Sequence, residues 1–403
     1  MPRDKTGAGV AGRFSVELSP DMLANIHGRL SCLDRIAFAS VFRKSRDAFK
    51  PEAPWLVLPG DTLESATVLS LADRCVPAER SPSPAMRGHG LIGSSRGWLV
   101  TADERGRMSL ANPVTGEQRA LPAITTIPCI EEWTGPSLFI FDLKPFVRGP
   151  PYARGEPYPH EKYMLRFDQM RNDLYRKVVL SDGGHGAAML ITGWLFGVAA
   201  FTTMEDATWR LAPSRDGVED AIHHDGRFYS VTYSGAVEVW EHDAYGGVFT
   251  SATVTPGPAN AGWTHPGLCR RYLVAAPGGR FMVVLKTDRY NRSRRTSSFK
   301  VHVLDGAQWK ETDDIGDTAL FVGANESLCM STMVHPELKA GCVYFTEDRL
   351  GQASLWKDAP SYGDDGQRGL GVFCLKDGTM EKVEGQGWHR SWPPPAWFTP
   401  SIP

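Results

Sequence analysis

A chain of 403 residues exceeds the size at which one hydrophobic core stops growing, so two units or one ring of repeats are expected. Hydrophobic residues make up 42% of the chain and charged residues 22%, a composition that excludes a disordered protein. The formal net charge of -2 excludes a global field that would draw the molecule onto nucleic acid or an anionic membrane, so neither partner is expected.

The cysteines and the N-terminus indicate where the protein resides. Seven cysteines occur singly and without a CxxC pair, which predicts reduced thiols. They are Cys32, Cys75, Cys129, Cys269, Cys329, Cys342 and Cys374. Residues 1–14 lack the apolar core of a secretory signal, and the most apolar stretch, residues 187–201, is too short to cross a bilayer. The sequence therefore predicts a cytoplasmic protein, a nuclear protein or one found in both compartments.

Residues 18–50 carry the helical periodicity of the chain. A serine cap at Ser19 and a proline at the first helical position, Pro20, are typical of a helix start. Apolar residues then recur at three- and four-residue spacing, as Met22, Leu23, Ile26 and Leu30. After a polar break, Asp34 can begin a second helix that carries Ile36, Ala37 and Val41. The pattern predicts a helical hairpin of about 30 residues, which is too small to bury its own apolar face.

From about residue 90 onward the pattern changes to short strands separated by Gly, Asn, Asp and Pro turns. Residues 97–103 and 108–113 predict a hairpin, followed by a strand that ends at Leu121. Further strands of the same kind are expected at residues 163–167 with 177–180, 188–202 with 208–211, 226–240, 271–285 with 299–304 and 309–311, and 318–323 with 342–346 and 371–375. The spacing of about 40 to 50 residues favours the four-stranded blades of a β-propeller, about six or seven of them.

The end of the chain is expected to close this ring. A closed propeller removes exposed sheet edges, and a last blade that borrows strands from both ends ties the ring shut. The expected closing strand is residues 371–375, paired with residues 380–383. Residues 393–395 are then expected to lie across the surface. Trp397 and Phe398 favour an anchored terminus over a polyproline ligand for another protein.

The N-terminal hairpin resembles an F-box, the motif by which receptor subunits of cullin-based ubiquitin ligases bind their adaptor. The resemblance rests on residues 18–23, Ile26, residues 29–30, residues 34–35 and residues 41–45. Phe42 and Ser45 stand where a cysteine and a tryptophan are common in that motif. The resemblance implies that Leu18, Pro20, Leu23, Ile26, Leu30, Val41 and Arg43 bind the adaptor.

A larger resemblance spans nearly the whole chain. The segments that carry it are residues 93–99, 112–116, 228–235, 316–323 and 392–398. They are similar, in the same order, to a plant family of F-box proteins with a KIB-type β-propeller, also called domain of unknown function 295. The resemblance implies a mainly β fold, with a small α-helical F-box at residues 14–50, a linker and first strands at residues 51–89, and the propeller at residues 90–403.

The family resemblance also implies a function. The protein is expected to be the non-catalytic substrate-recognition subunit of a Skp-cullin-F-box type ubiquitin ligase. It would dock a Skp-family adaptor, and through it the cullin scaffold, by the F-box, while the propeller grips an unknown target protein. The resemblance implies no cofactor. The alternative is a propeller interaction module that has lost adaptor binding and works without the ligase, a hypothesis that Phe42 and Ser45 favour.

Four other patterns have simpler interpretations. Residues 88–93 match GxGxxG, but no strand precedes and no helix follows, so a turn entering a blade is expected instead of a dinucleotide site. His223 and His224 have no third ligand at metal spacing, and a turn at Asp225 explains them better. Asn291 and Asn325 match the glycosylation pattern, but neither is expected to be modified without a secretory signal.

The last of these patterns is a basic cluster formed by Lys286, Arg289, Arg292, Arg294, Arg295 and Lys300. It could bind phosphate, nucleic acid or an import receptor, but a solvated loop between strands is the preferred interpretation.

No serine, histidine and aspartate stand in a nucleophile context such as GxSxG, and no carboxylate pair is distinguished from the turn aspartates. The protein is therefore expected not to be an enzyme and to hold no metal.

Overall fold

The computed structural model divides the chain into two compact units, Met1–Pro51 with Pro403, and Glu52–Ile402. The residues that it describes are 18–30, 34–35, 38, 52–59, 65–72, 79–82, 89–133, 138–141, 163–181, 186–193, 197–203, 205–243, 247–258, 269–291, 294–349, 369–384 and 393–400. In this part of the chain, no helix has the length and apolar character needed to cross a membrane.

The first unit contains helix α1 (Pro20–His27), which begins where the sequence predicts it. The Ser19 hydroxyl accepts a hydrogen bond from the backbone N–H of Met22 at 3.3 Å, and Pro20 occupies the first turn, where its missing N–H costs nothing. The helix ends at His27, and Gly28 is its C-cap. Residues 34, 35 and 38 are also helical, in line with a second helix, whereas Ile36, Ala37, Val41 and Arg43 lie outside the described residues.

The second unit is a six-bladed β-propeller. Blade 1 combines β1 (Trp55–Pro59), β2 (Ser65–Ser70) and β3 (Glu79–Pro82) with β28 (Ala396–Phe398) from the end of the chain. Blade 2 consists of β4 (Gly90–Ser95), β5 (Trp98–Ala102), β6 (Met108–Ala111) and β7 (Gln118–Leu121). Blade 3 consists of β11 (Tyr175–Leu180), β12 (Ala187–Thr192), β13 (Ala199–Thr203) and β14 (Arg210–Ala212).

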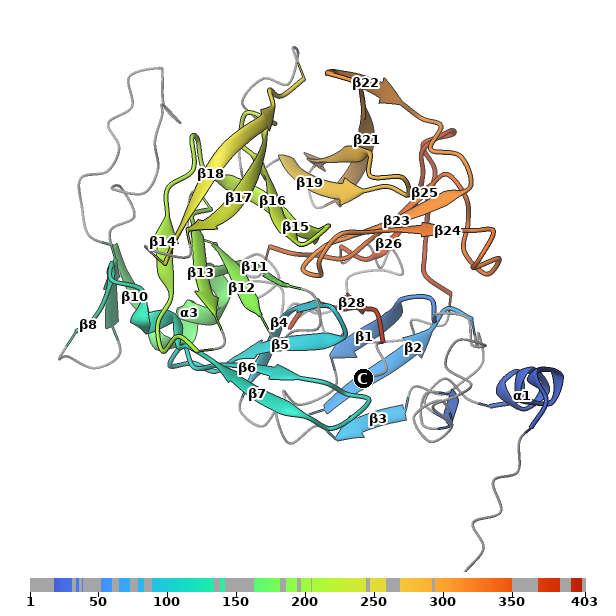
Figure 1. The fold of residues 1–403 in the computed structure, drawn as a ribbon, viewed down its shortest axis with the longest axis horizontal. Helices are drawn as coiled ribbons and strands as arrows, with labels where there is room; N and C mark the ends of the chain where they lie inside the picture. Colours follow the sequence, from blue (N-terminus) through green and yellow to red (C-terminus); the bar gives the residue numbers. More distant parts are fainter. Residues whose placement is uncertain are drawn as a thin grey trace, which may run out of the picture. The chain divides into compact units, whose positions relative to one another are not determined.

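The remaining three blades complete the ring (Figure 1). Blade 4 consists of β15 (Val218–His224), β16 (Arg227–Thr232), β17 (Val237–Asp243) and β18 (Val248–Thr255). Blade 5 consists of β19 (Cys269–Ala275), β20 (Phe281–Asn291), β21 (Arg294–Asp305) and β22 (Gln308–Thr312). Blade 6 has the order β24-β23-β25-β26-β27, from β23 (Thr318–Val322), β24 (Leu328–Ser331), β25 (Cys342–Phe345), β26 (Gly371–Cys374) and β27 (Met380–Glu381).

The blades are antiparallel except at one place, where β23 and β25 of blade 6 pair in parallel. The inner strands touch in the order β28, β4, β11, β15, β19 and β24. Blade 6 meets blade 1 where the ring of Phe321 lies 5.0 Å from that of Trp397, within one apolar cluster. Every residue of β4 is buried, while most of β7 and β22 is at least partly exposed, so the packed interior lies toward the inner strands.

A small sheet is inserted between blades 2 and 3 in the sequence. It contains β8 (Ile130–Trp133), β9 (Leu138–Phe141) and β10 (Tyr163–Arg166), preceded by the short helix η3 (Ile124–Thr126) and followed by α3 (Phe167–Asp173). Because β4 contacts β11 directly, this sheet is not a blade, and the expected six or seven blades are six. The predicted grouping of residues 163–167 with 177–180 is wrong, since β10 pairs with β9 whereas β11 starts blade 3.

The ring closes as the sequence predicts, with strands from both ends, but a different segment performs the closure. Strands β26 and β27 pair with each other as expected, yet they belong to blade 6. The closing strand is β28, which pairs with β1 in blade 1. Residues 393–395 are buried and do not lie on the surface. The propeller strands therefore begin at Trp55, within the segment predicted as linker and first strands, and not at residue 90.

Three motif interpretations are decided by the fold. Asp225 and Gly226 have φ of 46° and 76°, the two positive values of a type I′ turn. The hairpin of β15 and β16 therefore accounts for His223 and His224, as expected. The GxGxxG segment supplies β4, an inner strand, and not the turn that the sequence indicates. Asn325 is only 1% exposed, so its side chain is not open to glycosylation.

Candidate functional site

Residues 323–327, the connection that joins β23 to β24, contact the inner strands of blades 2 and 4 and are called the central segment below. All five of its residues are buried. The N–H of Glu326 donates to the carbonyl of Ser94 in β4 at 2.8 Å, and Asn325 forms an isolated parallel bridge with Ser94. A piece of blade 6 thus pairs directly with the inner strand of blade 2.

The carboxylate of Glu326 ties the central segment to two other blades. One oxygen accepts from the Ser95 hydroxyl at 2.7 Å and lies 3.3 Å from Nε of Arg96. The other accepts from the backbone N–H of His223 in β15 at 2.9 Å. Glu326 is 5% exposed, and a buried carboxylate is stable only with such charge-assisted partners.

The close approach of the central segment to β4 requires a glycine. A Cβ at Gly93 would lie 2.6 Å from the carbonyl oxygen of Ala324, closer than real Cβ atoms come to backbone. A Cβ at Gly90, in the same strand, would meet nothing nearer than 3.5 Å. We expect Gly93→Ala to cost about 1–3 kcal/mol of stability through overpacking, and Gly90→Ala to be tolerated. Thermal unfolding of the two variants tests this, and equal melting temperatures would contradict the tight contact.

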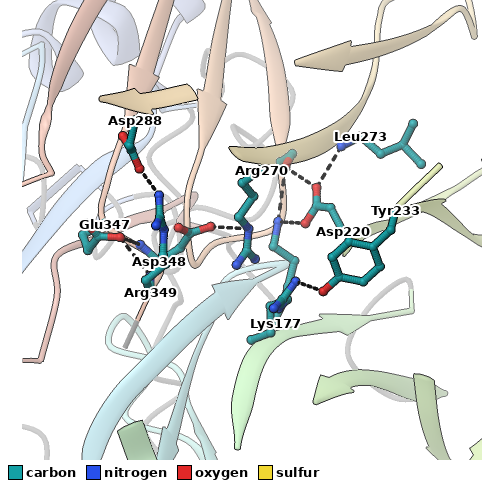
Figure 2. Close-up of polar contacts among 11 residues, drawn as sticks. Lys177, Asp220, Tyr233, Arg270, Leu273, Asp288, Glu347, Asp348 and Arg349 are labelled. Carbon is teal, nitrogen blue, oxygen red and sulfur yellow. Dashed lines mark hydrogen bonds and ion pairs between the residues drawn. The ribbon is translucent and has the colours of Figure 1, made fainter. Parts of the chain in front are cut away.

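A buried ion pair joins blades 3 and 4 beside the central segment. Lys177 of β11 pairs with Asp220 of β15, and both side chains are fully buried (Figure 2). The second Asp220 oxygen accepts from the Ser327 hydroxyl at 3.0 Å and from the Leu273 N–H at 2.9 Å. Burial lowers the pKa of Lys177, while Asp220 opposes this effect by favouring the charged form. The pair therefore links β11, β15, β19 and the central segment.

A second buried pair joins blade 5 to the chain that leaves β25. Nε of Arg270 in β19 lies 2.6 Å from Asp348, and Figure 2 shows Arg270 between Asp348 and Asp220. Burial acts to raise the pKa of Asp348, but Arg270 and further cations outweigh it, so this pKa is lowered. The neighbouring Arg349 pairs with Asp288 of β20.

A third pair, between Glu219 of β15 and Arg271 of β19, joins blades 4 and 5 at 3.1 Å. Arg271 also donates to the carbonyl of Tyr233 at 3.0 Å. Burial raises the pKa of Glu219, and Arg271 acts against that rise. These three buried pairs connect blade 3 with blade 4, blade 4 with blade 5, and blade 5 with the chain that leaves β25. Among the described residues there is no group of three or more His, Cys, Asp or Glu side chains that could hold a metal ion.

The residues of the basic cluster, which was predicted to be a solvated loop, differ in their burial in the structure. Lys286 is 1% exposed, and its Nζ lies 5.4 Å from the centre of the Phe345 ring, so it belongs to the interior. Arg289 is exposed in β20, and Lys300 pairs with Glu311 in the same sheet at 2.7 Å. The solvated-loop interpretation is therefore wrong for Lys286.

The predicted adaptor-binding residues lie in the first unit, and the structure describes the burial of Leu18, Leu23, Ile26 and Leu30. Ile26 and Leu30 are half-buried, as is Leu18, and Met22 is 55% exposed. Leu23 is 8% exposed, so little of this predicted adaptor-binding side chain is accessible in the free chain. Pro20 occupies the first turn of α1. The role of these residues in adaptor binding stays a prediction.

Sequence reasoning missed the polar centre of the propeller. Its charged residues include Lys177, Asp220, Arg270, Arg271, Glu326 and Asp348, together with Glu219, the partner of Arg271. The available signal was a charged residue inside a strand otherwise rich in apolar residues, as Lys177 is in YRKVVL. Which of these charges meet could not be inferred, because the partners come from different blades.

Three comparisons relate this chain to known proteins. A family model described as the KIB1-4 beta-propeller matches residues 68–374. The F-box protein At2g17036 of Arabidopsis thaliana is 25% identical over 234 residues, 53% of this chain and 53% of that protein, so the match spans about half of the relative's length. Among solved structures, the Cps50 (Swd1) β-propeller domain of Myceliophteria thermophila is 9% identical and covers 64% of this chain and 81% of that one, with a TM-score of 0.31.

Proposed function

Because the chain belongs to the KIB1-4 β-propeller family, we propose that it is the substrate-recognition subunit of a Skp-cullin-F-box type ubiquitin ligase. The observation that carries this proposal is that the chain has the propeller of this family and is similar in sequence to a protein named as an F-box protein. A capped helix with F-box-like apolar spacing in a separate compact unit supports it. We place this function in the cytoplasm, the nucleus or both.

The proposed mechanism is proximity and includes no chemistry by the receptor itself. The F-box unit docks a Skp-family adaptor that is bound to the cullin scaffold, while the propeller binds a target protein. Tethering raises the effective concentration of the target's lysines near a ubiquitin-charged enzyme. The buried ion pairs support this role because they hold the blades in fixed positions, and a rigid ring presents its connecting loops in one arrangement.

Replacing Ile26 with aspartate tests the docking step. Ile26 follows Met22 by one helical turn, so the two side chains share a face of α1, and neither is fully buried. A carboxylate placed in an apolar interface has no partner, so we expect a loss of at least about 2 kcal/mol, roughly thirtyfold in affinity for the purified adaptor. Leu23→Asp is less informative, because a charge at this buried position would damage the unit itself.

The matched control is Asn25→Asp, which adds the same charge to an exposed position of the same helix. Adaptor affinity of this variant should equal that of the unmodified chain. Equal affinities for the Ile26→Asp and Asn25→Asp variants would contradict docking through α1.

A second candidate function is an interaction module that works without the ligase. The burial of Leu23 favours it, because a predicted docking residue is already packed within the free chain. Phe42 and Ser45 favour it as well, since they replace residues common in adaptor-binding motifs. In that case the purified adaptor would bind neither the unmodified chain nor the Asn25→Asp variant.

A further inference from the structure

Two cysteines that are distant in the sequence face each other in blade 6. Cys342 in β25 and Cys374 in β26 are directly opposite in the antiparallel register. Their Sγ atoms lie 3.0 Å apart, although 32 positions separate them in the chain. Both are free thiols in this structure. The sequence pattern, with its isolated cysteines, gave no indication of this pair.

The hydrogen bonding of β26 shows that this position suits a cross-link. The N–H of Cys374 donates to the carbonyl of Thr379, away from β25, and the N–H of the next residue, Leu375, donates to Gly341 on the β25 side. Cys342 and Cys374 therefore form a non-hydrogen-bonded pair, the kind in which opposite side chains are closest, with Cα atoms about 4.5 Å apart. A disulfide accepts Cα separations of roughly 4.4–6.8 Å, so no backbone movement is needed.

We propose that Cys342 and Cys374 are a modification site that forms a reversible disulfide by exchange with a small disulfide such as oxidised glutathione. Cys374 is the half-buried thiol of the two, so it reacts first. Its thiolate attacks one glutathione sulfur, and the other glutathione leaves as a thiolate that takes up a proton. Cys342 then loses its proton, attacks the Cys374 sulfur and expels the second glutathione. Two protein thiols are oxidised, and one glutathione disulfide is reduced to two thiols.

The second step is expected to be the slow one. Burial, together with the neighbouring Cys374 sulfur, raises the pKa of Cys342 to about 12, so little of its thiolate is present near neutral pH. The thiolate is the attacking species, and its fraction rises roughly tenfold per pH unit below the pKa. The rate of cross-link formation should therefore rise between pH 7 and pH 9.

The cross-link would enclose the connection between β25 and β26 in a covalent loop. The connection between β25 and β26 begins with residues 346–349, which include Asp348, the partner of Arg270, and Arg349, the partner of Asp288. Cys342 begins β25 and Cys374 ends β26, so a disulfide between them would close the hairpin at the end opposite this connection. It also restricts the unfolded chain, so the oxidised propeller should be more stable than the reduced one.

The test is oxidation of the folded, full-length chain in buffers of reduced and oxidised glutathione, followed by alkylation of free thiols and peptide mapping. We expect a peptide linked through Cys342 and Cys374 to form, to disappear on reduction, and to raise the melting temperature. Cys374→Ser should leave Cys342 free to be alkylated and remove the shift in melting temperature. Cys329→Ser, which changes a half-buried cysteine in β24 of the same blade, should leave the cross-link unchanged.

Two results would overturn the proposal. One is a glutathione adduct that persists on Cys374 without conversion to the linked peptide. The other is a cross-link that appears only under denaturing conditions, because it would then not depend on the folded register of β25 and β26.

Discussion

Replacing Asp220 with alanine is expected to lower the free energy of unfolding by about 3–5 kcal/mol. Lys177 would remain fully buried without its counter-charge, and the Ser327 hydroxyl and the Leu273 N–H would lose an acceptor. Chemical denaturation followed by tryptophan fluorescence measures the change.

Two further variants separate this effect from a general sensitivity to lost charges. Asp305→Ala removes the partner of Lys310 from a pair whose side chains are both more than 60% exposed, and the unfolding midpoint should not move. A double variant, Lys177→Met with Asp220→Leu, replaces the pair by apolar groups and should be more stable than Asp220→Ala. If Asp220→Ala unfolds at the same denaturant concentration as the unmodified chain, the buried pair does not hold blades 3 and 4 together.

Deleting residues 393–403 is expected to abolish the cooperative unfolding of the propeller. The deletion removes β28, and with it Trp397 and Phe398, which are fully buried. The ring of Trp397 contacts Phe321 at 5.0 Å and Tyr344 at 5.9 Å, so blade 6 would lose its packing on blade 1. Strand β1 would also expose an unpaired edge, which invites aggregation. Thermal melting and limited proteolysis report the loss.

A synthetic peptide of residues 393–403 provides the control for this deletion. Added to the truncated chain, it should pair with β1 and restore a cooperative transition, because the missing strand is supplied in trans. A truncated chain that melts cooperatively and resists protease without the peptide would show that β28 is dispensable.

The local elements of the propeller could be predicted because alternating apolar residues and turn residues lie next to each other in the chain. The hairpin of β5 and β6 and that of β16 and β17 occur where the pattern indicates. Ring closure was harder, because β28 has three residues and pairs with a strand more than 300 positions away. The blade number could not be fixed, since the inserted β8, β9 and β10 have the same local pattern as a blade.

The two candidate sites differ in how far the sequence reveals them. The start of α1 could be predicted from Ser19 and Pro20, because a helix cap is a local interaction. The burial of Leu23 depends on the packing of the unit and is not encoded in helical spacing alone. The pairing of Lys177 with Asp220 depends on which blades are neighbours, so no pattern within either strand indicates it.

Recovery of partners from plant cells tests the central claim, that the chain links a ligase adaptor to a target, most directly. Tagged full-length chain would be purified and probed for the Skp-family adaptor, the cullin and enriched ubiquitinated proteins. The account predicts that adaptor and cullin are recovered with the unmodified chain and with Asn25→Asp, and are lost with Ile26→Asp. Absence of both from the unmodified chain, or equal recovery with Ile26→Asp, would contradict it.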